Sequence, residues 1–204
     1  MKKFSLFFMI LLAAWSFQSC NNESTATDSV EAAEDSNESK MSDSKMSSDS
    51  GANTMGATTV KEDDAQFAVE AASGGMMEVE TSQLAQQKAQ NAKVKEFAAM
   101  LVTDHTAANN ELKSLASSKN ITLPATMGDD HQKHVKDLNE KSGADFDKAY
   151  MKMMVDDHKE DVDKFEKASE KCEDPDLKAF AAKTLPVLRK HLDAAKSTND
   201  ALKK

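Results

Sequence analysis

Three histidines, each with an acidic residue close by, are the residues of this sequence best suited to chemistry. The pairs are Asp104 with His105, Asp157 with His158, and Asp193 with His191. Imidazole nitrogens bind zinc, copper and iron, and neighbouring carboxylates can hold imidazole rings in a fixed orientation. The sequence therefore raises the hypothesis of a transition-metal centre, provided that the three rings meet.

Helical periodicity places each histidine on the apolar stripe of a different helix. Around His105, apolar residues recur at steps of four and three, namely Val94, Ala98, Leu101, Ala108, Leu112 and Leu115. His158 and His191 occupy similar stripes, and Glu78 lies on the inward side of a further helix. Three imidazoles and one carboxylate would converge if the four helices align at this level.

A buried polar network is the other interpretation, and from the residues alone we favour it. A histidine in a helical core is commonly satisfied by one hydrogen bond, for which Tyr150 and Glu78 are available. Periodicity predicts only that residues face inward, not that they share a level. In the metal hypothesis, His105, His158, His191 and Glu78 are the ligands of zinc, copper or iron, and the surrounding groups are Asp104, Asp157, Tyr150 and Asp193.

Several enzyme classes lack their signatures here. No Glu-x-x-His pair occurs, which argues against the oxygen chemistry of di-iron carboxylate bundles. There is no Gly-x-Ser-x-Gly and no glycine-rich phosphate loop. We therefore expect no enzymatic activity, with a metal-dependent oxidoreductase as the weakest hypothesis. His131 and His134, at i, i+3 spacing on a short polar helix, are expected to be exposed.

The start of the chain is typical of a bacterial lipoprotein. Lys2 and Lys3 precede an apolar run over residues 4–17, which is too short to span a bilayer. Residues 1–19 are predicted to be a signal peptide, and Cys20 is predicted to carry the lipid anchor. Asn21 after the cysteine favours sorting to the outer membrane. The other cysteine, Cys172, is expected to be a small apolar residue near a helix end.

Residues 20–60 are predicted to form a disordered acidic linker. Residues 21–60 hold eight acidic residues against two lysines, and they contain little apolar surface to offset the entropy of ordering. The whole chain carries a net charge of −9 and has no basic patch. Nucleic acid is therefore an unsuitable partner, and the expected partner is a membrane, reached through the lipid.

Residues 61–204 are predicted to form one all-α domain. Helical patterns cover residues 62–88, 91–119, 129–141, 144–171 and 175 onward, with no alternating strand pattern. Four long helices and one short extra helix predict an antiparallel four-helix bundle. Gly74 and Gly75 fall inside the first helix, where we expect either the close approach of a neighbouring helix or a kink.

The helical part resembles the domain of unknown function 4142 family. The motifs that carry the resemblance include Glu78-Val79-Glu80, Val94-Lys95, Phe97-Ala98, Asp104-His105-Thr106, Phe146-Asp147, Tyr150, Met154-Val155, His158, Leu185-Pro186 and His191-Leu192. The resemblance implies a ferritin-like helical bundle in the bacterial envelope, with no established activity. Its motif positions correspond to Glu78, Glu80, Asp104, His105, Tyr150, His158 and His191. The expected function is that of an envelope lipoprotein with a binding or stress role, and metal binding is the alternative.

Overall fold

The computed structural model describes residues 27–47 and 60–203, and within these ranges every regular element is a helix. The helices are α1 (Ser29–Ser47), α2 (Glu62–Lys88), α3 (Ala92–Ser118), α4 (Asp129–Asn139), α5 (Gly143–Lys171) and α6 (Pro175–Ala201). The prediction of an all-helical fold is confirmed. Helices α2 to α6 each begin within one residue of the predicted position, and α3 and α6 start at a side chain that caps the helix. Asn91, for example, accepts a hydrogen bond of 2.9 Å from the Lys93 backbone N–H.

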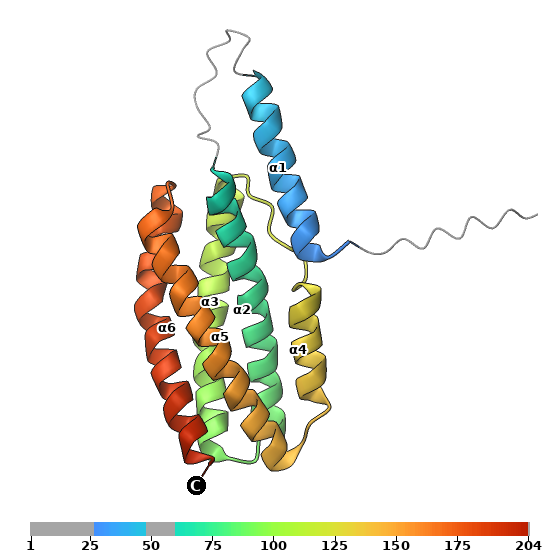
Figure 1. The fold of residues 1–204 in the computed structure, drawn as a ribbon, viewed down its shortest axis with the longest axis vertical. Coiled ribbons are helices and arrows are strands. Elements are labelled where there is room, and N and C mark those ends of the chain that lie inside the picture. The colour runs from blue at the N-terminus through green and yellow to red at the C-terminus, as the bar shows by residue number, and fades with distance from the viewer. Residues whose placement is uncertain (1–26, 48–59, 204) are drawn as a thin grey trace, which may run out of the picture.

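Four long helices, α2, α3, α5 and α6, lie side by side (Figure 1). In this view α2 and α6 run downward, whereas α3 and α5 run upward. The contacting pairs are α2 with α3, α5 with α6, α2 with α5, and α3 with α6. Each helix therefore contacts two antiparallel neighbours, and the four enclose a common interior. The short helix α4 packs on the outside, against α2 and α5. None of the described helices is long and apolar enough to cross a membrane.

The prediction of a disordered linker is wrong for Ser29–Ser47, because these residues form helix α1. This helix packs against α2, and Ala33 and Asn37 are buried in the contact. The Asn37 side chain donates to the Thr122 carbonyl at 2.9 Å and accepts from the Thr122 N–H at 2.7 Å. A low apolar content predicted disorder, but side-chain hydrogen bonds to the α3–α4 connection hold α1 in place. The predicted signal peptide, Cys20 and residues 48–59 lie outside the described residues.

Two buried aspartates tie the tight helix connections to neighbouring helices. The Asp147 carboxylate on α5 accepts from the backbone N–H groups of Gln90 and Asn91 at 3.1 and 2.8 Å. At the other end of the molecule, Asp64 on α2 accepts from the N–H groups of residues 173 and 174 at 3.2 and 2.6 Å. Because unpaired N–H groups at a helix start are costly to bury, these aspartates fix the level of each helix against its neighbours.

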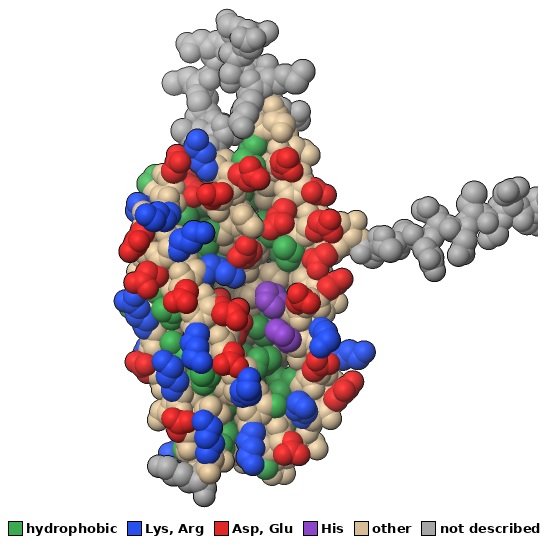
Figure 2. Space-filling view, in the orientation of Figure 1, with side chains coloured by type: hydrophobic (Ala, Val, Ile, Leu, Met, Phe, Trp, Pro, Cys, Tyr) green, Lys and Arg blue, Asp and Glu red, His purple; other side chains and the backbone are tan. Residues whose placement is uncertain are grey.

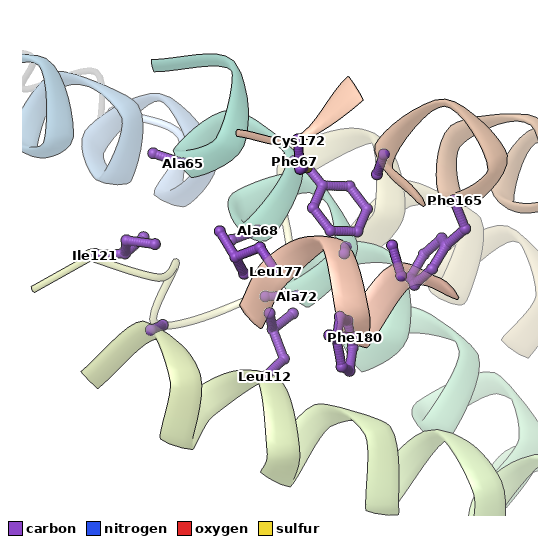
Figure 3. Close-up of a cluster of buried hydrophobic side chains, with 14 of the residues drawn as sticks. Ala65, Phe67, Ala68, Ala72, Leu112, Ile121, Phe165, Cys172, Leu177 and Phe180 are labelled. Atoms are coloured by element: carbon purple, nitrogen blue, oxygen red, sulfur yellow. The ribbon is translucent and has the colours of Figure 1, made fainter. Parts of the chain in front are cut away.

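The hydrophobic core is divided into two clusters along the length of the helices. One cluster is built around Phe67, Phe165 and Phe180, whose rings pack edge to face or tilted with centroids 5.1 and 6.0 Å apart (Figure 3). The other cluster is built around Phe146 and Tyr150 at the opposite end. Between the two clusters lies a polar layer, which contains all three histidines of the sequence-based hypothesis.

The two adjacent glycines in α2 have different surroundings, and this predicts different effects of substitution. A Cβ on Gly75 would lie 2.1 Å from Asn109 Oδ1 on α3, whereas a Cβ on Gly74 would meet nothing within 4 Å among the described atoms. We expect Gly74→Ala to stabilise the protein by about 1 kcal/mol through helix propensity. Gly75→Ala should gain less, because Asn109 must move. Urea unfolding of both variants measures the difference, and equal gains would contradict the close approach of α3.

Candidate metal centre

The structure brings His105, His158 and His191 together in the polar layer. They come from α3, α5 and α6, and their ring centroids are 5.2 to 5.5 Å apart. One ring nitrogen of each histidine lies within 4.8 Å of one nitrogen from each of the other two. All three side chains are buried, and His158 is completely so. The helices therefore align at the level that the metal hypothesis requires.

Each ring is held through one of its two nitrogens. His158 Nδ1 donates to the Met154 carbonyl at 3.0 Å, within the same helix. His191 Nε2 donates to Asp104 Oδ2 on α3 at 2.9 Å. His105 Nδ1 lies 2.7 Å from Glu78 Oε2 on α2. These partners are oxygens, which is how imidazole ligands of metals are usually oriented in proteins.

The second nitrogen of each ring forms what we call the open set, defined as His105 Nε2, His158 Nε2 and His191 Nδ1. All three atoms are buried and find no hydrogen-bond partner among the described residues. A buried polar atom without a partner costs on the order of 1–3 kcal/mol, so a protein rarely keeps three of them in one place without a use. The donor set matches what a transition metal ion binds.

Burial keeps the imidazoles neutral. It lowers the pKa of His105 to about 4, and it lowers the pKa of His158 well below the usual value, with further lowering by His105 and His191. The pKa of His191 is also lowered by burial, although its bond to Asp104 opposes the shift. Because His158 and His191 each donate through the other nitrogen, their open nitrogens carry lone pairs at neutral pH.

Glu78 adds a carboxyl group to the cluster. Its side chain is buried, and its Oε1 atom lies 3.4 Å from His158 Nε2 without a hydrogen bond to that ring. The carboxyl group of Glu78 pairs with those of Asp157 and Asp161. Burial raises the pKa of Glu78 well above the usual value, and the charge of Asp161 adds to this. Asp157 lies near Glu78 and His158, and burial followed by the charge of Glu78 raises its pKa. Three acidic groups therefore gather beside the open set.

Asp161 is the residue of this site that the sequence reasoning missed. Its pKa is raised by burial, and its charge acts on both Glu78 and His105. The signal was present, because Asp157 and Asp161 are four residues apart on α5 and share a helix face. Reading acidic residues at i+4, and not only beside each histidine, would have found it.

The residues expected around the histidines have mixed outcomes. Asp104 does orient a ring, but it is the ring of His191 on the neighbouring helix and not that of His105. Asp193 is exposed on α6, so its predicted role beside His191 is wrong. The Tyr150 hydroxyl bonds to Ser82 Oγ at 2.8 Å, and the charge of Glu78 contributes to the raised pKa of Tyr150. Asp157 does lie beside His158. Closeness in sequence failed for the other two pairs because neighbouring helical residues point in different directions.

The remaining candidates lie outside the cluster. Glu80 is exposed on α2. His131 is partly buried, and its Nδ1 atom bonds to Ser73 Oγ at 2.7 Å, whereas His134 is exposed as expected. Cys172 is buried in the hydrophobic cluster around Phe67, and burial raises its thiol pKa to about 12. A thiol of this kind remains protonated at neutral pH, which agrees with a packing role.

The fold and the site together define an all-helical domain with a buried cluster of three histidines. This chain belongs to the family described as Domain of unknown function (DUF4142), which matches residues 49–198. The resemblance inferred from its motifs is thereby confirmed. None of the curated proteins matches the chain.

Two solved structures resemble this fold. The crystal structure of a DUF305 fragment from Deinococcus radiodurans has a TM-score of 0.62 at 9% identity, covering 70% of this chain and 98% of that one. The structure of CopM in the Cu(II)-bound form has a TM-score of 0.59 at 17% identity, covering 68% of this chain and 96% of that one. At these identities the similarity concerns the fold alone.

Proposed function

We propose that this protein binds a transition metal ion through His105, His158 and His191, with Glu78 as a fourth ligand. The observation that carries the proposal is the histidine cluster, in which one nitrogen of each ring lies within 4.8 Å of one nitrogen of each other ring. Each ring also has one buried nitrogen without a partner among the described residues, while its opposite nitrogen is held by an oxygen. A polar network that served only to stabilise the fold would satisfy these atoms. Metal binding thus replaces the sequence-based preference for such a network.

Copper(II) is the metal that this donor set favours. Neutral imidazoles suit copper, zinc and iron, and among divalent ions copper(II) binds most tightly to a given nitrogen and oxygen site. CopM, whose fold is similar, has been solved with Cu(II) bound. The sulfur of Cys172 lies in a hydrophobic cluster away from the histidines, so the expected ligands are nitrogen and carboxylate oxygen.

Binding should release a proton from the pair formed by Glu78 and His105. The raised pKa of Glu78 and the lowered pKa of His105 favour a pair in which the carboxyl group donates to Nδ1 and the ring hydrogen sits on Nε2. A metal can bind Nε2 only when that hydrogen has left and the carboxyl proton has passed to Nδ1. Because metal and proton compete, affinity should rise with pH.

The proposed setting is the bacterial envelope. A signal peptide over residues 1–19 and a lipid on Cys20 would anchor the helical domain to a membrane, and the outer membrane is our assignment. We assign the four long helices to a ferritin-like antiparallel bundle, in which sites are built from side chains on facing helices. The role that we propose for this buried site is metal storage, sensing or protection.

Metal analysis of the full chain, purified without a histidine tag, tests the proposal. We expect one equivalent of Cu(II) after loading and dialysis, and tighter binding at pH 8 than at pH 6 by isothermal titration calorimetry. His134→Ala is the matched control, since it removes an exposed imidazole and should leave the stoichiometry unchanged. Substoichiometric metal that added copper, zinc or iron does not restore would refute the proposed function.

A further inference from the structure

A cavity between α4 and α5 reaches the edge of the histidine cluster. Its volume is about 340 Å³, and acidic residues outnumber basic ones in its lining. The charged and imidazole side chains that line it are those of Asp137, Asp156, Asp157, Glu160, Lys141, Lys152 and His134. Figure 2 shows histidine, acidic and basic side chains meeting at the surface beside α4, with hydrophobic side chains among them. Carboxylate and imidazole groups at a surface opening attract and weakly hold metal cations.

Asp157 is the residue that links this cavity to the buried site. It lines the cavity, and its buried Oδ2 atom has no N–H or hydroxyl donor among the described residues, although its carboxyl group pairs with that of Glu78. With Glu78 and His158 it forms a second group whose ligand atoms lie within 4.8 Å of one another. Glu78 is 1% exposed, and its Oε1 atom likewise has no N–H or hydroxyl donor in the described parts of the chain. Two paired, buried carboxyl groups thus lie beside His158.

The two groups share a single nitrogen. His158 Nδ1 is bonded to the Met154 carbonyl, which leaves only Nε2 for a metal. A cation held by Asp157, Glu78 and His158 and a cation held by the three histidines would therefore both use this atom. Because one lone pair serves one ion, the two positions must be occupied in succession and not together.

A route from solvent is required because the histidines themselves are closed off. The side chains of His105, His158 and His191 are 5%, 0% and 1% exposed. Asp157, by contrast, is only partly buried and sits where cavity and cluster meet. It is thus the first cluster oxygen that an ion coming through the cavity would meet.

We propose that the cavity between α4 and α5 is the metal uptake route, and that Asp157 with Glu78 first captures the cation and passes it to the three histidines through His158. This inference rests on the proposed function. Asp157 is a transfer residue in this scheme and not a permanent ligand. Its removal should slow both uptake and release while leaving the equilibrium affinity nearly unchanged.

Stopped-flow mixing of the metal-free full chain with Co(II), whose visible absorption reports imidazole coordination, tests this route. Asp157→Asn should slow uptake about tenfold or more, because an amide oxygen binds a cation more weakly than a carboxyl oxygen does. Asp156→Asn is the matched control, because it makes the same substitution in the same cavity at a side chain paired with Lys152. Ala149→Phe, which fills the cavity without changing charge, should also slow uptake.

The outcomes separate this inference from the proposed function. If wild type binds Co(II) but Asp157→Asn and Ala149→Phe take it up at the wild-type rate, the route is refuted and the metal centre stands. If Asp157→Asn weakens equilibrium binding as much as His158→Ala does, Asp157 is a permanent ligand and the transfer role is wrong. If wild type binds no metal, the proposed function fails and the route fails with it. Circular dichroism of each variant establishes that the helices are intact.

Discussion

His158→Ala should abolish the thermal stabilisation that Cu(II) gives to the wild-type protein. A ligand present at a hundredfold excess over its dissociation constant stabilises the folded state by about 2.7 kcal/mol. For a chain of this size that corresponds to a rise of about 5–10 °C in the unfolding midpoint. His158 contributes the nitrogen common to both candidate groups, so its loss should leave no site of comparable affinity. Differential scanning calorimetry with and without Cu(II) measures the effect.

The control for this experiment is again His134→Ala, whose imidazole is exposed on α4. It should keep the full copper-induced shift, whereas His105→Ala and His191→Ala should lose most of it. A shift that persists in all three core variants would mean that copper stabilises the protein from another place. Metal-free midpoints must be compared first, because each substitution also changes the core.

Replacing Glu78 and His105 together should lower the free energy of unfolding of the metal-free protein by much less than the sum of the two single effects. The carboxyl and ring are 2.7 Å apart in a buried layer. His105→Leu leaves the carboxyl without this bond, and Glu78→Met leaves His105 Nδ1 without it, so each should cost about 1–3 kcal/mol. In the double variant neither polar group is present, so neither is left without a partner. Replacing a buried polar pair by apolar side chains of similar size is often neutral or stabilising.

Urea unfolding of the four proteins in the presence of a chelator measures this coupling. We expect a coupling free energy of at least about 1 kcal/mol, which is typical of residues in direct contact. Strictly additive effects would show that the pair does not form. The double variant should also bind no copper, so that it gains stability at the cost of function, as is common for polar groups kept in protein cores.

The polar layer explains why such a trade-off should exist here. Two apolar clusters on either side supply the packing that holds the helices together. The layer between them contains open nitrogens and carboxyl groups whose burial opposes folding in the absence of metal. A bound cation would give these groups their missing partners, so the site should destabilise the folded state most when no metal is bound.

The sequence by itself determined helices α2 to α6 and the direction in which their residues face. Helix starts follow from caps such as Asn91 and Asp174, and inward faces follow from the helical repeat. Both are local properties, set by residues within one or two turns of one another. The sequence also argued against di-iron chemistry and identified all three histidines.

Only the tertiary structure decided which of these residues meet. The periodicity that turned His105, His158 and His191 inward carried no information on their level along the helices. That level is set by long-range bonds such as those of Asp147 and Asp64 to distant connections. The partner of His191 is Asp104, 87 positions away, and not the nearby Asp193. Helix α1 is a similar case, since it is held by Thr122 and not by its own hydrophobicity. Contacts between segments far apart in sequence depend on packing, and local patterns of residues do not encode them.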